Sequence, residues 1–282
     1  MRTIAEIIKS GEELLSEACI PDARRDASTL VGLAIGQDRS FIFSHPEYEP
    51  TAEESERIDQ FLHRRAGREP LQYIRGTQEF YGLEFEVTPD VLIPRPETEM
   101  IVERAIGFLN GLGEPRFLDI GTGTGCIPIS ILKNLPNAAG VAVDISKDAL
   151  AVAARNAERN GVAERLELIE SDLFSNVPAE KFDLIVSNPP YVPGNELAHL
   201  QPEVRDHEPH IALSDGRDGV SIIERIILDA RHFLPVGGVL LMEMGFGQSE
   251  RVLEFAIENG WIYAEVELDL QGIPRMLFAK SL

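Results

Sequence analysis

The sequence predicts an α/β protein in which a small helical bundle precedes a mostly parallel β-sheet with helices on both faces. Residues 1–75 carry apolar side chains at helical spacing. After Glu97, short apolar runs alternate with helical stretches, which favours a parallel sheet. The last two runs are separated only by Gly272-Ile273-Pro274, a connection too short for a parallel crossover, so we expect an antiparallel pair there.

The composition excludes several classes of protein. The 282 residues have a formal net charge of −21, which argues against general electrostatic binding to nucleic acid or to an anionic membrane. Cys19 and Cys126 are too few for a disulfide framework or a zinc site. No apolar run reaches the ~18 residues of a membrane span, and the charged start MRTIAEIIKS is unlike a secretory signal. We expect a soluble protein of a reducing compartment, without a metal.

Local signals support the helical bundle. Thr3 with Glu6, and Thr51 with Glu54, have the spacing of capping boxes at helix starts. Gly36 is a suitable end for the second helix.

A basic cluster follows within the same region, formed by Arg64, Arg65, Arg68 and Arg75. Two interpretations stay open. The cluster is either a solvated helix face or a docking surface for a macromolecular partner.

Residues 76–93 are expected to join two domains. Glu79–Thr88 is aromatic and interrupted by Gly82, which indicates a hairpin, and Pro89, Pro94 and Pro96 follow. The predicted domains are a helical domain at 1–75, a hairpin and linker at 76–93, and a sheet domain at 94–282.

In the sheet domain, each apolar run predicts a strand. Helices such as Ile127–Leu135 and Lys147–Asn160 are predicted between the strands. The predicted strands are Arg116–Ile120, Gly140–Asp144, Leu166–Glu170, Leu184–Ser187, Val239–Met242, Tyr263–Asp269 and Arg275–Lys280.

A glycine loop follows the first of these strands. Gly121-Thr122-Gly123-Thr124-Gly125 lies between a strand and a helix, where bare backbone amides and the helix dipole favour a ligand. A dinucleotide fingerprint would have its third glycine at position 126, where this chain has Cys126. Asp144 closes the next strand, and a carboxylate there can accept both hydroxyls of a ribose. The loop predicts a nucleoside-containing ligand, either a dinucleotide or an adenosyl-sulfonium compound.

Asn188-Pro189-Pro190-Tyr191 favours the second of these ligands. The segment follows the strand Leu184–Ser187, at the sheet edge where ligands bind. The Asn188 side-chain oxygen and the Pro189 carbonyl can accept the two hydrogens of a planar NH₂ group, and Tyr191 can cover its flat face. Such positioning and fixed dipoles promote methyl transfer to nitrogen without a titrating base.

With these motifs the chain resembles class I S-adenosylmethionine-dependent methyltransferases. More narrowly it resembles the HemK/PrmC family, which methylates the glutamine amide in the Gly-Gly-Gln motif of class 1 peptide chain release factors. The narrower resemblance rests on Pro94-Arg95-Pro96-Glu97-Thr98-Glu99 together with Asn188–Tyr191, and extends to Glu243-Met244-Gly245 and Asp269…Gly272…Arg275. It implies a seven-stranded sheet, S-adenosylmethionine as cofactor, a cytoplasmic enzyme and an N-terminal domain that docks the release factor.

The resemblance also implies roles for individual residues. Asn188, Pro189 and Tyr191 would be catalytic, and Asn188 through Tyr191, with Arg95, Glu97 and Thr98, would bind the substrate. The cofactor would contact Gly121, Thr122, Gly123, Thr124, Gly125, Asp144, Asp172, Leu173 and Asn188. Leu173 would flank the adenine at a position that is often aromatic in relatives, and Asp172 would orient its amino group.

Three alternatives remain at this point. The same Asn-Pro-Pro-Tyr clamp suits the N6 amino group of adenine in nucleic acid, although the charge of −21 opposes it. A non-catalytic nucleotide-binding module would bind the cofactor without methyl transfer. A NAD-linked dehydrogenase is disfavoured by Cys126 in the glycine loop.

Overall fold

The computed structural model describes residues 2–282, which divide into two compact units. The helical unit comprises the residues up to Thr77 together with Gln201–His207. The sheet unit comprises Gln78–Leu200 and Glu208–Leu282. The sequence contained no indication that Gln201–His207 would group with the first helices. The domain limits drawn from the sequence remain a prediction.

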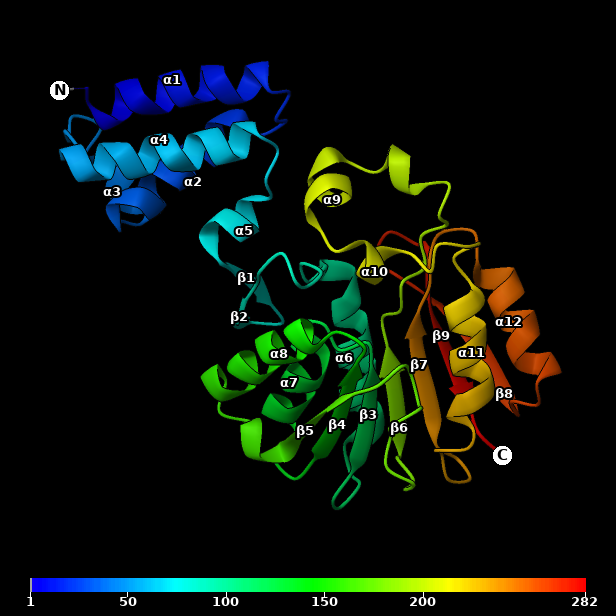
Figure 1. Cartoon of the computed structure of the whole chain (residues 1–282). Coiled ribbons are helices and arrows are strands. Elements are labelled where there is room, and N and C mark those ends of the chain that lie inside the picture. Colours follow the sequence, from blue (N-terminus) through cyan, green and yellow to red (C-terminus); the bar gives the residue numbers. More distant parts are fainter. Residues whose placement is uncertain (1) are drawn as a thin grey trace. The chain divides into compact units, whose positions relative to one another are not determined.

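The helical unit contains short helices around an apolar core (Figure 1). The side chains of Ile4, Leu15, Leu30 and Ile58 are fully buried in it. The helices are α1 (Ile4–Glu17), α2 (Ala23–Ile35), α3 (Arg39–Ser44), α4 (Ala52–Ala66), α5 (Leu71–Arg75) and α9 (Pro202–His207).

The predicted helix ends are confirmed. The Thr3 hydroxyl accepts a hydrogen bond from the Glu6 amide, and the Glu6 carboxylate accepts one from the Thr3 amide. Thr51 and Glu54 form the same reciprocal pair at the start of α4. Gly36 ends α2 with φ 68°, a left-handed conformation that glycine adopts without steric cost.

Arg65 departs from both interpretations of the basic cluster. The residue is only 6% exposed, and its guanidinium donates to Asp26 at 2.9 Å and to Glu203 at 3.0 Å. Arg68 donates to the second oxygen of Glu203 at 2.6 Å. These carboxylates neutralise the two arginines and join α2, α4 and α9 inside the helical unit.

Replacing Arg65 with alanine is expected to lower the free energy of unfolding by about 3 kcal/mol, because it leaves buried carboxylates without their cation. Arg64→Ala is the matched control. Arg64 pairs with Glu69 at a partly exposed position, so its loss should cost at most about 1 kcal/mol. Chemical denaturation, with amide exchange of α2 and α4, measures both values. Equal losses from the two variants would contradict the structural role of Arg65.

The sheet unit is built around one large sheet (Figure 1). Within residues 2–282, seven strands form this sheet in the order β5-β4-β3-β6-β7-β9-β8. All neighbours are parallel except β9, which is antiparallel to both β7 and β8. The strands are β3 (Arg116–Ile120), β4 (Ala139–Asp144), β5 (Leu166–Glu170), β6 (Leu184–Ser187), β7 (Val239–Glu243), β8 (Tyr263–Leu268) and β9 (Pro274–Lys280). The predicted fold class is confirmed.

Helices cover both faces of the sheet. α6 (Glu99–Leu109), α7 (Cys126–Asn134) and α8 (Lys147–Arg159) contribute to the apolar core of one face. α11 (Ser221–Ala230) and α12 (Ser249–Glu258) contribute to the core of the other. A small hairpin of β1 (Thr77–Phe80) and β2 (Leu83–Glu86) occupies the region where the sequence indicated one, and α10 (His210–Leu213) follows α9.

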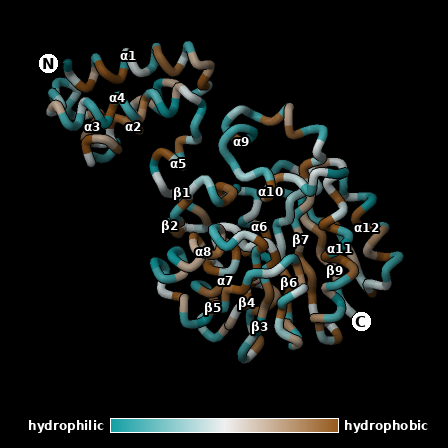
Figure 2. Tube along the Cα trace, viewed as in Figure 1, coloured by the Kyte–Doolittle hydropathy of each residue, from teal (hydrophilic) through white to brown (hydrophobic). Residues whose placement is uncertain are grey.

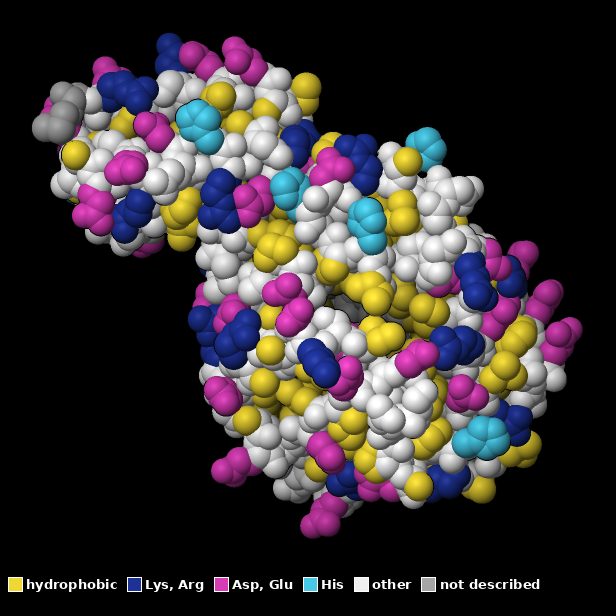
Figure 3. Space-filling model, in the orientation of Figure 1, with side chains coloured by type: hydrophobic (Ala, Val, Ile, Leu, Met, Phe, Trp, Pro, Cys, Tyr) yellow, Lys and Arg dark blue, Asp and Glu magenta, His cyan; other side chains and the backbone are white. Residues whose placement is uncertain are grey.

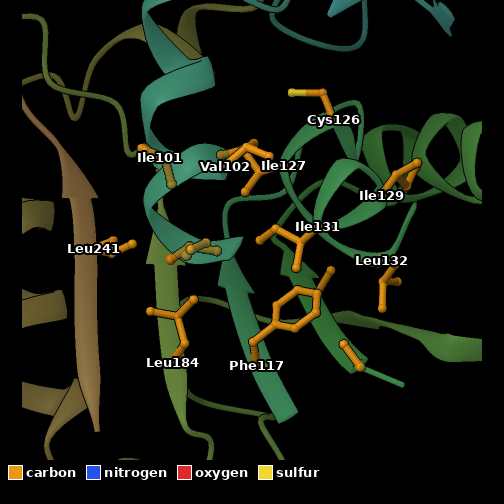
Figure 4. Packing of buried hydrophobic residues seen from close by; sticks show 14 of the residues in the cluster. Ile101, Val102, Phe117, Cys126, Ile127, Ile129, Ile131, Leu132, Leu184 and Leu241 are labelled. Carbon is orange, nitrogen blue, oxygen red and sulfur yellow. The ribbon is translucent and has the colours of Figure 1, made fainter. Parts of the chain in front are cut away.

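Burial on both faces explains why the central strands are such clear apolar runs. Side chains alternate along β3, so that Phe117 packs in one core and Leu118 in the other. Figure 4 shows Phe117, Leu184 and Leu241, from three different strands, in the core that also holds Ile127 and Ile131 of α7. Figure 2 shows the same strands as the most hydrophobic part of the chain's trace.

The strand order changes direction beside β3. The chain proceeds from β3 outward to β4 and β5, then returns to β6 on the other side of β3. In open α/β sheets, ligands bind at the carboxyl ends of the strands at such a point. No helix in the described part of the chain is long and apolar enough to cross a bilayer.

Candidate active site

The glycine loop leaves β3 and leads directly into α7. Gly121, Gly123 and Gly125 all have positive φ values, of 74°, 54° and 78°, and a side chain at any of the three would be strained. A Cβ at Gly125 would also lie 2.9 Å from Ile129 Cδ1 and 3.3 Å from Ala153 Cβ. Gly125 therefore allows the loop to pack closely on α7 and α8, although its spacing differs from that of a dinucleotide fingerprint.

Asp144 lies at the end of β4 and holds the glycine loop. Its carboxylate accepts hydrogen bonds from the Gly123 and Ser146 amides, both at 2.9 Å. Burial raises the pKa of Asp144, and the backbone donors oppose that rise. Each oxygen retains a lone pair for a ligand hydroxyl. The cap of α8 is Ser146, because its hydroxyl accepts from the Ala149 amide.

Asp119 was not among the site residues predicted from the sequence. The residue is fully buried on β3, two positions before the loop, and neither carboxylate oxygen has a hydrogen-bond partner among the described residues. The Thr122 hydroxyl, in the loop itself, is buried and lowers the pKa of Asp119, although no hydrogen bond of regular geometry joins the two. Burial raises the pKa of Asp119 to about 7. An acidic residue at the end of an apolar strand before a glycine loop was the available signal.

Asp172 and Leu173 follow β5, on the far side of Asp144 from β3. Leu173 has a φ of 48°, and its carbonyl accepts from the Ser171 hydroxyl at 2.7 Å. The Asp172 carboxylate is half-exposed and pairs with Arg225 of α11 at 3.1 Å. Arg225 was not anticipated, because its sequence neighbours carry no motif.

The Asn-Pro-Pro-Tyr segment follows β6 and is tied to two other elements. Asn188 donates through Nδ2 to the Thr98 hydroxyl at 3.0 Å. The Tyr191 hydroxyl donates to Glu243 at 3.0 Å, and the Thr98 hydroxyl donates to the same carboxylate at 2.7 Å. The Tyr191 carbonyl accepts from Gln248. Burial, together with the charge of Glu243, raises the pKa of Tyr191 far above its usual range, so the phenol acts as a hydroxyl donor.

Arg95 is paired with a buried carboxylate. Its guanidinium donates to Glu208 at 2.5 Å, and the Glu208 side chain also accepts from the Ile93 amide at 3.2 Å. Glu208 is 4% exposed. The pair fixes the Ile93–Arg95 backbone in the wall of the cavity described next.

A cavity of about 380 Å³ brings most of the predicted site together at the carboxyl ends of the strands. Figure 3 shows a hollow rimmed by hydrophobic side chains on the sheet unit. Twelve predicted residues line the cavity: Arg95, Thr98, Gly121, Thr122, Gly123, Thr124, Asp144, Asp172, Leu173, Asn188, Pro189 and Pro190. Gly125, Tyr191 and Glu97 are outside the lining. Gly125 and Tyr191 each follow a lining residue in the sequence, and Glu97 is in the turn Pro96–Thr98. Within residues 2–282, no cluster of three or more His, Cys, Asp or Glu side chains is arranged to hold a metal ion.

Comparisons with known proteins agree with this arrangement. A PrmC N-terminal domain matches residues 6–76, and a methyltransferase small domain matches residues 108–202. A release factor glutamine methyltransferase of Geobacter sulfurreducens is 42% identical over 98% of this chain and 95% of that protein. One of Koribacter versatilis is 40% identical over 99% of each.

Solved structures show the fold. A methyltransferase from Pyrococcus furiosus superposes with a TM-score of 0.54 at 20% identity, over 81% of this chain and 100% of that one. Because the curated relatives match along almost the whole length, through the helical region as well as the glycine loop and the Asn-Pro-Pro-Tyr segment, the chain belongs to the family of release factor glutamine methyltransferases.

Proposed function

We propose that this enzyme transfers a methyl group from S-adenosylmethionine to the side-chain amide nitrogen (N5) of the glutamine in the Gly-Gly-Gln motif of class 1 release factors. The observation that carries the proposal is the orientation of Asn188. Its Nδ2 is bound to Thr98, so its Oδ1 is left to accept from a substrate NH₂ group in the cavity. The related release factor glutamine methyltransferases supply the substrate class.

The cavity fits the proposed cofactor. Asp144 has lone pairs for the ribose hydroxyls, and the positive-φ glycines expose backbone amides. Leu173 offers an apolar contact for the adenine, with Asp172 nearby for its amino group. When bound, S-adenosylmethionine supplies an electrophilic methyl group on a positively charged sulfonium. The buried Thr122 hydroxyl lines the cavity and is a polar atom that such a hydrogen-bonding ligand would satisfy.

Binding of the cofactor should weaken as the pH falls below 7. Burial raises the pKa of Asp119 to about 7, and its ionised form, although outside the cavity lining, favours a cationic ligand more than its neutral form does. Affinity measured by calorimetry should therefore be lower at pH 6 than at pH 7, by at most about fivefold. Asp119→Asn should flatten this dependence. An unchanged pH profile in that variant would contradict the role of the buried charge.

The chain acts on the substrate amide by positioning it. Asn188 Oδ1 and the Pro189 carbonyl each accept one hydrogen of the NH₂ group, which fixes the nitrogen and polarises it toward the methyl group. Pro190 has no amide hydrogen, which leaves one donor fewer to compete for these oxygens. Tyr191 packs behind the clamp and is held there by Glu243 and Gln248. Arg95 and Thr98 line the adjoining wall of the cavity, and Glu97 lies between them in the turn Pro96–Thr98.

The helical domain at 1–75 is proposed to dock the release factor, with 76–93 as linker and 94–282 as catalytic domain. The PrmC N-terminal match over residues 6–76 supports this division. Because release factors act at the ribosome, we place the reaction in the cytoplasm.

Adenine-N6 methylation of nucleic acid is the competing activity for the same clamp. The relatives and the net charge of −21 do not favour it. Incubation with tritiated cofactor and equal amounts of release factor, DNA and RNA separates the two. Label is expected in the protein fraction, and label confined to nucleic acid would overturn the proposed function.

A further inference from the structure

Glu243 is a buried acid outside the cavity lining, described so far only as the partner of Thr98 and Tyr191. It ends β7 and is 2% exposed. Its two oxygens accept from two different hydroxyls, Thr98 at 2.7 Å and Tyr191 at 3.0 Å. Burying a carboxylate costs free energy unless its partners compensate, so the position of this acid calls for a reason.

The reason lies in the direction of the hydrogen bonds. An ionised carboxylate accepts and never donates, so both hydroxyl protons must be directed at Glu243. The Thr98 oxygen then has only lone pairs left, and Asn188 must turn Nδ2 toward it. The amide of Asn188 thereby has one allowed orientation, with Oδ1 available to the substrate. Without the carboxylate, Thr98 can donate instead, and a flipped Asn188 would present its own NH₂ to the substrate NH₂.

We propose that Glu243 is a positioning residue that sets the hydrogen-bond direction of the substrate clamp, through Thr98 to Asn188 and directly to Tyr191. The inference rests on the proposed function in one respect, that the substrate presents an NH₂ group, because only such a group requires an acceptor at Asn188.

The geometry around Glu243 supports its role as an acceptor, because each carboxylate oxygen has its own hydroxyl donor. Burial raises the pKa of Glu243 overall, while the Thr98 and Tyr191 hydroxyls and the nearby charge of Arg275 oppose that rise, and Glu97 adds to it. Arg275 is itself held by Asp269. The two hydroxyl donors are the kind of partner that favours the charged form of a buried acid.

The test compares Glu243→Gln with Glu254→Gln, the same change at an exposed position on α12. Glutamine keeps the size of the side chain but places a donor where one acceptor was. We expect kcat to fall roughly 30-fold, from lost positioning, while the Kd of the cofactor stays unchanged. Thr98→Val should act alike, Thr98→Ser should recover most of that loss, and the double variant Glu243→Gln/Thr98→Val should lose little more than either alone.

A second measurement follows Asn188 itself, without turnover. In protein labelled with ¹⁵N-asparagine, the Asn188 NH₂ signal is identified by its absence in Asn188→Asp. Exchange of the Nδ2 proton held by Thr98 should be slow in the wild type and at least about tenfold faster in Glu243→Gln, because its hydrogen bond is no longer enforced.

The outcomes separate this inference from the proposed function. Wild-type kcat and wild-type exchange in Glu243→Gln would overturn the role of Glu243, as would equal losses in Glu254→Gln. If the wild type methylates no release factor while the exchange rates still differ as expected, the proposed function fails and the assignment of Glu243 stands.

Discussion

Replacing Asn188 with alanine is expected to lower turnover about a thousandfold, because the substrate NH₂ group loses the acceptor that orients and polarises it. The cofactor should still bind, with affinity reduced at most about tenfold, since Asn188 is only one of the residues that line its cavity. Single-turnover methylation of a release factor, with calorimetry of cofactor binding, measures both quantities.

The control for this change is Asn195→Ala, at an exposed asparagine in the same loop. It should retain wild-type turnover, since Asn195 is not among the residues lining the cavity. Equal activity of Asn188→Ala and wild type would remove the amide clamp from the mechanism.

Asp144→Ala should mainly weaken the binding of the cofactor. The carboxylate is proposed to accept the ribose hydroxyls, and it also fixes the Gly123 amide. Hydrogen bonds to a charged acceptor contribute about 1.5–3 kcal/mol each, so the Kd of S-adenosylhomocysteine should rise about 100-fold. At saturating cofactor, kcat should fall far less.

Asp148→Ala makes the same change at an exposed position in the first turn of α8, and it should leave this Kd near its wild-type value. A large drop in kcat at saturating cofactor, without a change in Kd, would show that Asp144 acts elsewhere.

The sheet was predictable because its strands are buried on both faces. The predicted strands Arg116–Ile120, Leu166–Glu170 and Leu184–Ser187 agree with the structure at both ends, since continuous apolar runs between turn residues leave little choice of boundary. Others differ by a residue, as where β4 begins at Ala139.

Local hydrogen bonds were equally predictable from the sequence. The capping boxes involve side chains three residues apart, and Gly36 needs only its own backbone conformation. Such features depend on neighbours in the sequence, and so a sequence pattern can indicate them.

Long-range polar pairs could not be predicted. Thr98 and Glu243 are 145 residues apart, and Arg95 and Glu208 are 113 apart. Nothing in either local sequence specifies the other partner. Arg65 shows the consequence: its neighbours suggested an exposed cluster, whereas distant Glu203 and Asp26 make it a buried ion pair.

The candidate site was predictable from the sequence only in part. The glycine loop and Asn188–Pro190 are short motifs at strand ends, and the strand order brings them into one cavity. Tyr191 and Glu97 belong to equally distinctive motifs but lie outside the lining, because neighbours in a turn point in different directions. Their predicted contacts with the substrate remain proposals.

The central claim is that this chain methylates the glutamine of the Gly-Gly-Gln motif. Mass spectrometry of a release factor incubated with the enzyme and S-adenosylmethionine tests it most directly. The account predicts that the Gly-Gly-Gln peptide gains the mass of one CH₂ unit, located by fragmentation on the glutamine side chain, and that Asn188→Ala abolishes this gain. An unmodified Gly-Gly-Gln peptide under conditions where the enzyme binds the cofactor would contradict it.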